Sequence, residues 1–84
     1  MKKYLNKNGN SGVLAYELGS DFARIKFING SIYRYTEASV GLDNLNRIKL
    51  LAKRGEGLST FISQFIKSNF ASSLAIFPRT VRHE

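Results

Sequence analysis

Residues 23–36 of the chain read ARIKFINGSIYRYT, and this stretch decides the fold. It consists of two runs in which apolar and polar residues alternate, joined at Asn29-Gly30. Asn-Gly between two runs of β-branched and aromatic residues is the strongest short-range signal for a β-hairpin, because both residues tolerate a positive φ. We therefore predict an antiparallel hairpin that turns at residues 28–30.

The length of the turn decides which side chains share a face of this hairpin. A two-residue loop would place Phe27 opposite Ile32 and mix charged with apolar side chains on both faces. A three-residue loop at residues 28–30, with a left-handed glycine in a G1 bulge, pairs Phe27 with Ser31 and Ile25 with Tyr33. We predict this bulged register because it separates the side chains by character. One face then holds Ala23, Ile25, Phe27, Tyr33 and Tyr35, and the other holds Arg24, Lys26, Ile32 and Arg34.

A third strand is predicted at residues 13–18, where the sequence VLAYEL also alternates. The Gly-Ser that follows would form a two-residue loop and align Tyr16 with Ala23 and Leu14 with Ile25. The apolar face of the hairpin then continues through Leu14, Tyr16 and Leu18. The three strands form an antiparallel meander whose apolar face must be covered.

The second half of the chain supplies the cover as two helices with apolar stripes. The first spans residues 39–55, with Gly55 as a left-handed C-cap and with acidic residues early and basic residues late, as the helix dipole favours. The second spans residues 58–70, with Ser59 as a candidate N-cap. The stripes are Leu42, Leu45, Ile48, Leu51 and Ala52, then Leu58, Phe61, Ile62, Phe65, Ile66 and Phe70. The expected fold is α+β, a three-stranded antiparallel meander with two α-helices packed on one face (β-β-β-α-α).

Length and charge limit the classes of protein to which the chain can belong. Its 84 residues suffice for one domain, which we place at residues 12–70, between a flexible basic arm at 1–11 and a partly disordered tail at 71–84. Thirteen Lys and Arg against six Asp and Glu give a net charge of +7, which favours nucleic acid or an acidic protein as partner. There is no cysteine, no secretory signal and no run long enough for a membrane span, so we expect a cytoplasmic protein, as a monomer.

The chain resembles the KTSC domain, a module named for the C-terminal extension of some lysyl-tRNA synthetases. The resemblance covers about Ser11 to Phe70 and centres on the Tyr33-Arg34-Tyr35 triplet. It also includes Leu14 to Tyr16, Ile25-x-Phe27 with Asn29-Gly30, the break from Ala52 to Gly55, and Leu58, Ser59 and Ile62. The resemblance implies a free-standing protein of bacterial or phage type. It also implies a family without an established activity that is suspected of binding RNA.

The residues that catalysis would need are absent or scattered. One histidine, His83 near the end of the chain, cannot form a pair for a metal or a catalytic triad. The glycines do not form a phosphate-binding loop, and the acidic residues fall at turns and caps. We therefore expect no catalytic residues, no metal site and no cofactor, and keep an enzyme as the weakest of three hypotheses.

The candidate binding residues are basic and lie on the predicted sheet. Tyr33 and Tyr35 could stack on bases if exposed, but the bulged register turns them toward the core. Arg24, Lys26 and Arg34 form the candidate nucleic-acid site, and Lys49, Lys53 and Arg54 form a secondary basic patch. The first hypothesis is a small non-enzymatic accessory domain that binds nucleic acid, RNA before DNA, through this basic sheet face. The alternative is a protein-interaction module that docks a partner through its sheet edge or outer face.

Overall fold

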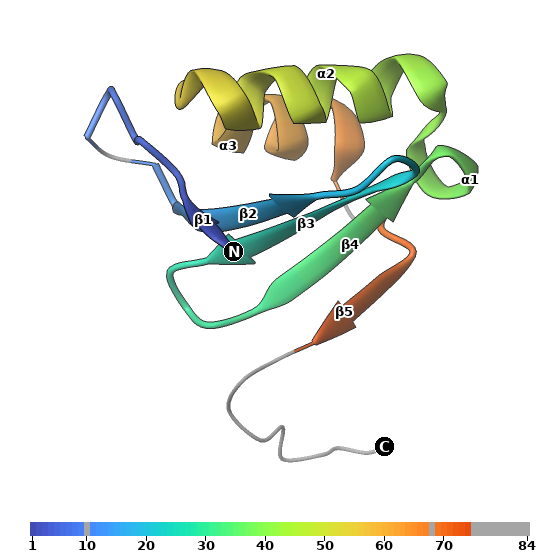
Figure 1. Cartoon of the computed structure of the whole chain (residues 1–84), viewed down its shortest axis with the longest axis horizontal. Helices are drawn as coiled ribbons and strands as arrows, with labels where there is room; N and C mark the ends of the chain where they lie inside the picture. Colours follow the sequence, from blue (N-terminus) through green and yellow to red (C-terminus); the bar gives the residue numbers. More distant parts are fainter. Residues whose placement is uncertain (10, 68, 75–84) are drawn as a thin grey trace.

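The computed structural model describes residues 1–9, 11–67 and 69–74. They form two layers, an antiparallel sheet and a set of helices packed on one of its faces (Figure 1). The sheet has five strands in the order β1-β2-β3-β4-β5, so each strand pairs with its neighbours along the chain. The elements are β1 (Lys2–Lys3), β2 (Val13–Leu18), β3 (Phe22–Phe27), β4 (Ile32–Thr36), α1 (Glu37–Val40), α2 (Leu42–Arg54), α3 (Leu58–Phe61), the π-helical turn η1 (Ile62–Ile66) and β5 (Ser72–Leu74). The α+β class and the central meander are confirmed, but the sheet has one further strand at each edge.

The hairpin β3–β4 has the predicted bulged register. Ile25 lies opposite Tyr33, and the Phe27 amide donates to the Ser31 carbonyl at 2.9 Å. The Gly30 amide closes the turn by donating to the Phe27 carbonyl at 2.8 Å, and Gly30 has a φ of 91°. The positive φ explains why glycine occupies this position.

The register between β2 and β3 differs from the prediction. Tyr16 lies opposite Ile25 rather than Ala23, because the two turn residues fall one position later than predicted. The amide of Gly19 and the carbonyl of Phe22, which flank the turn, are hydrogen-bonded at 3.0 Å. A shift of two residues leaves each side chain on its predicted face. Tyr16 therefore still faces the helices.

A bulge near the start of β2 exchanges the faces of Val13 and Leu14. The register shifts between Val13, which lies opposite Phe27, and Ala15, which lies opposite Lys26. Val13 is consequently 2% exposed, whereas Leu14 is 42% exposed. The prediction that Leu14 faces the core is wrong, because one extra residue in the bulged strand reverses the alternation beyond it.

The first residues of the chain belong to the sheet and the core, in contrast to the flexible arm predicted at residues 1–11. Lys2–Lys3 pair with β2 as an edge strand. Tyr4 is buried, and its hydroxyl accepts a hydrogen bond from the Leu58 amide at 3.3 Å. A two-residue strand is too short to produce a recognisable alternation in the sequence.

The first predicted helix is divided at Gly41 into α1 and α2. Thr36 and Ser39 form a capping box at the start of α1, in which each side chain accepts a hydrogen bond from the other residue's amide. α2 ends at Arg54, and its C-cap Gly55 has the predicted left-handed conformation with a φ of 79°. The buried side chains of α2 are Leu45, Ile48 and Ala52, whereas Leu42 is 53% exposed.

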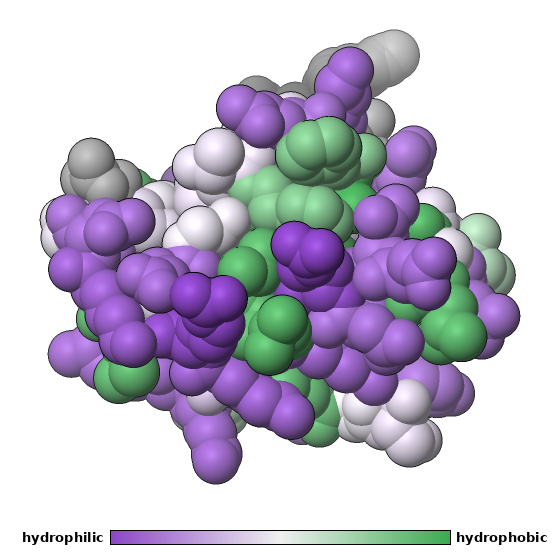
Figure 2. Space-filling model, turned by 90° about the horizontal axis from the view of Figure 1, so that it is seen from above, coloured by the Kyte–Doolittle hydropathy of each residue, from purple (hydrophilic) through white to green (hydrophobic). Residues whose placement is uncertain are grey.

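The second predicted helix changes into a π-helical turn after Phe61. It begins at Leu58 with Gly57 as N-cap, so the predicted capping by Ser59 is wrong. Its buried side chains are Leu58, Ile62 and Ile66. Phe65 was expected in this stripe but is 64% exposed, because a π-helical turn is wider than an α-helical one and rotates it away. Figure 2 looks down on the helical layer and shows apolar side chains exposed among polar ones.

The end of the described chain adds the last strand. β5 pairs with β4, with Ser72 opposite Arg34, so part of the predicted tail belongs to the sheet. The disorder predicted for the rest of the tail concerns residues 75–84, which lie outside the described residues.

The core lies between the sheet and the helical layer. Its buried apolar side chains are Tyr4, Val13, Ala23, Ile25, Tyr35, Leu45, Ile48, Ala52, Leu58, Ile62 and Ile66. Strands and helices contribute to the same cluster, so the residues described form one packed unit. The helices use only one face of the sheet and leave the other without helical cover (Figure 1).

Candidate nucleic-acid interface

The face of the sheet opposite the helices, here called the outer face, carries the basic residues predicted from the hairpin. Arg24 and Lys26 of β3 alternate with the buried Ala23 and Ile25. Arg34 of β4 lies directly opposite Arg24, and directly paired residues share a face. The structure therefore brings Arg24, Lys26 and Arg34 together on one surface, as expected.

Arg24 is partly neutralised by a neighbouring strand. Its guanidinium forms an ion pair with Glu17 of β2 at 2.6 Å, and the two side chains are 35% and 45% exposed. These residues are also direct partners in the β2–β3 ladder. Exposed pairs of this kind contribute only about 0–1 kcal/mol to stability. The ion pair with Glu17 therefore mainly orients the Arg24 side chain along the outer face and adds little to the stability of the fold.

Arg34 rests on an aromatic ring. The central guanidinium carbon lies 4.3 Å from the centre of the Phe22 ring, which is within the range of a cation–π contact. The contact holds the charge of Arg34 over the outer face. Arg34 forms no ion pair in the part of the chain that the structure describes.

Lys3 is a further basic residue of the outer face that the sequence did not place there. It pairs with Ala15 of β2, and Ala15 pairs with Lys26 of β3. Lys3 and Lys26 therefore point to the same side of the sheet, separated by one small side chain. The only available signal was the pair of lysines itself, because the two-residue β1 has no readable alternation.

Tyr33 and Tyr35 lie on the other face, toward the helices. Tyr35 is 1% exposed, and burial raises its pKa well above the usual value of 10.0, with Tyr33 as a smaller cause. Tyr33 is half-buried between Phe27 at 5.4 Å and a stacked Phe70 at 4.6 Å between ring centres. Both tyrosines therefore act as core residues, and the outer face has no tyrosine platform for stacking bases.

The secondary basic patch is not a single cluster. Lys49 donates to the Ser20 carbonyl at 3.0 Å, and Arg54 forms an ion pair with Glu56 at 3.1 Å. Lys53 lies in a separate groove beside β1 and β2. Lys49 and Arg54 thus have different partners, and Lys53 lines a groove that neither of them lines.

In residues 1–9, 11–67 and 69–74, no group of three His, Cys, Asp or Glu side chains could hold a metal ion. Within the same ranges no helix is long and apolar enough to cross a membrane. His83 lies outside them. Comparisons of the chain with protein-family models, curated proteins and solved structures gave no match.

Proposed function

We propose that this chain is a small non-enzymatic accessory domain that binds nucleic acid through its outer face. Arg24, Lys26 and Arg34 contact phosphates, with little preference for base sequence. The preference for RNA over DNA rests on the resemblance to the KTSC domain, to which we propose the chain is related.

The opposition of Arg24 and Arg34 is the observation that carries the proposal. Like charges that face each other across a ladder destabilise a sheet. Glu17 forms an ion pair with Arg24 but not with Arg34. The three paired residues Glu17, Arg24 and Arg34 therefore keep a net positive charge. A phosphate placed between the two strands would relieve this repulsion.

Two further features support a phosphate backbone as the ligand. Lys3 extends the charge to the edge of the sheet, so cations occur on three of its strands. The outer face is also free of helical cover, so an extended chain can cross it (Figure 1). A positively charged surface that follows the backbone is the common element of proteins that bind single strands without sequence preference.

An amide-shift titration with a short unstructured RNA, at low and at moderate salt, tests the proposal. We expect shifts concentrated at residues 22–35 that weaken as the salt concentration rises. Replacing Arg24 and Arg34 together by Gln should weaken binding and lower the salt slope by about 1.4, since each phosphate contact on a single strand contributes about 0.7.

A matched control separates the outer face from overall charge. Replacing Arg47 and Lys7 by Gln removes the same charge from exposed residues outside the β3–β4 hairpin. If both double variants lose affinity equally, the outer face is not the site.

The alternative of a protein-interaction module depends on different residues. Ile28 at the hairpin tip is 71% exposed and could contact a protein partner. The edges of the central meander are less available to a protein partner than predicted, because β1 and β5 pair with them. Absence of any RNA-induced shift at low salt would contradict the nucleic-acid proposal and favour this alternative.

A further inference from the structure

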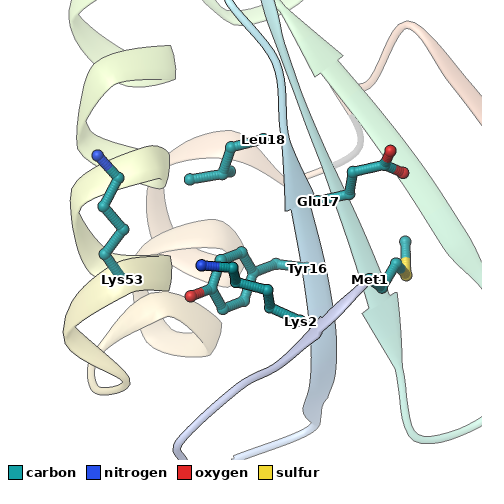
Figure 3. Close-up of a pocket in the computed structure, with 6 residues that line it drawn as sticks. All are labelled: Met1, Lys2, Tyr16, Glu17, Leu18 and Lys53. Carbon is teal, nitrogen blue, oxygen red and sulfur yellow. The ribbon is translucent and has the colours of Figure 1, made fainter.

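A groove of about 510 Å³ lies at the edge of the sheet, between β1, β2 and α2. It is lined by Met1, Lys2, Tyr16, Glu17, Leu18 and Lys53 (Figure 3). Lys2, Tyr16 and Leu18 point toward α2, from which Lys53 extends, whereas Glu17 points to the other side of β2 (Figure 3). The groove therefore has a basic side facing the helical layer, distinct from the outer face.

The two lysines of the groove are exposed and come from different elements of the fold. Lys2 pairs with Tyr16 in the β1–β2 ladder, so their side chains share the helical side of the sheet. Lys53 lies four residues after Lys49 and so on the same side of α2. Lys49 is bound to the Ser20 carbonyl, which fixes this side of the helix against the β2–β3 turn.

The positive charge of the groove is not neutralised by its own lining. Glu17 is the one acidic residue among the six, and its carboxylate is engaged by Arg24 on the outer face. In the described part of the chain neither Lys2 nor Lys53 forms an ion pair, and no hydrogen bond involves the Tyr16 hydroxyl. The Lys2 ammonium lies beside the Tyr16 side chain, and the Lys53 ammonium lies apart from both, along α2 (Figure 3). These three donors of the lining remain available to a ligand.

The walls between these donors are apolar. Tyr16 and Leu18 are partly buried and pack against the core, so their positions are fixed by the fold. Apolar walls with a few polar groups at fixed positions are typical of small-molecule sites. The ligand that fits it carries a compact negative group attached to an apolar or aromatic body.

We propose that the groove formed by Lys2, Tyr16, Leu18 and Lys53 binds the phosphate group of a phosphate monoester. A monoester carries close to two negative charges at neutral pH, which matches two lysines, and its oxygens can accept the phenol hydrogen bond. A carboxylate carries one charge and would leave one lysine without a partner. This site does not depend on the outer face and can be tested separately from it.

Titration of the labelled protein with phenyl phosphate at a pH of about 7.5, where the monoester is mostly dianionic, tests the proposal. We expect saturable amide shifts at Lys2, Tyr16, Leu18 and Lys53. Replacing Lys2 and Lys53 together by Gln should weaken binding about tenfold or more, because two charge-assisted contacts are lost. Benzoate, an aromatic acid with a single charge, should bind clearly more weakly than phenyl phosphate.

A matched double variant controls for overall charge. Replacing Lys7 and Arg47 by Gln removes the same charge from exposed residues outside both the groove lining and the outer face. This variant should bind phenyl phosphate like the unmodified chain. Equal weakening in the two variants, equal binding of benzoate, or shifts only elsewhere would each overturn the proposal.

Oligonucleotides with and without a 5′-terminal phosphate identify the source of the monoester. The two kinds of oligonucleotide are compared in the variant in which Arg24 and Arg34 are replaced by Gln, so that the outer face contributes little to binding. If the groove residues shift only with the oligonucleotide that carries the 5′-phosphate, the ligand is the phosphorylated end of a nucleic-acid strand. Groove shifts with phenyl phosphate alone assign a small phosphorylated molecule, and both results support the site. If RNA does not bind the outer face, either result for the groove still holds.

Discussion

The hydroxyl of Tyr4 accepts a hydrogen bond from the backbone amide of Leu58, at 3.3 Å and across 54 positions of sequence. Leu58 is the first residue of α3, and the N-cap residue Gly57 has no side chain that could accept from the free amides of that helix. Tyr4 and Leu58 are 2% and 0% exposed. The start of the chain therefore caps a helix from inside the core.

Replacing Tyr4 by Phe should lower the free energy of unfolding by about 1–3 kcal/mol, because the Leu58 amide is left buried without a partner. Urea unfolding measures the difference. Replacing Tyr16 by Phe is the control, since its ring is only partly buried and its hydroxyl has no partner among the described residues. Equal effects of the two changes would mean that the cap does not stabilise the fold.

Replacing Gly55 by Ala should destabilise the chain more than replacing Gly57. Both glycines have a left-handed backbone conformation, with φ of 79° and 80°. An alanine at either position would therefore be strained by about 1–2 kcal/mol. A methyl group at Gly55 would collide with the side chain of Leu5, whereas at Gly57 its nearest neighbour is Leu51 at 3.7 Å. The difference in unfolding free energy between the two variants, expected at about 1–3 kcal/mol, measures how firmly residue 5 is packed.

The buried phenol of Tyr35 should make stability depend on pH in the alkaline range. Its pKa is raised in the folded state, so folded and unfolded chains hold the same proton below about pH 10. Above that value the unfolded state loses the proton first, and stability falls by up to about 1.4 kcal/mol per pH unit. Urea unfolding from pH 8 to about 11 should show a smaller decline when Tyr35 is replaced by Phe. An unchanged decline in that variant would show that Tyr35 is not the cause.

The parts of the fold that the sequence predicted well are those with local signals. Asn29-Gly30 determined the turn and register of β3–β4, and Gly55 marked the end of α2. The bulge that exchanges Val13 and Leu14 has no glycine or other marker, because it arises from how β2 fits its neighbours. The π-helical turn that exposes Phe65 likewise follows from packing rather than from a residue pattern.

The candidate interface could be predicted where it lies on one hairpin. Arg24, Lys26 and Arg34 share a face through alternation and register alone. Lys3 joins them only through the pairing of β1 with β2, and Lys2 and Lys53 line the same groove only through the packing of α2 on the sheet. Contacts between residues distant in sequence have no local signal, so these positions required the three-dimensional structure.

The two-residue length of β1 has a consequence for the behaviour of the protein at high concentration. An exposed sheet edge is a template on which a second chain can add a strand and begin aggregation. Here the edge strand consists entirely of Lys2 and Lys3, which point to opposite sides of the sheet. A second copy that approached this edge with its own β1 would meet like charges above and below the plane. The same pair of lysines that supplies positive charge to two surfaces therefore also opposes polymerisation of the sheet.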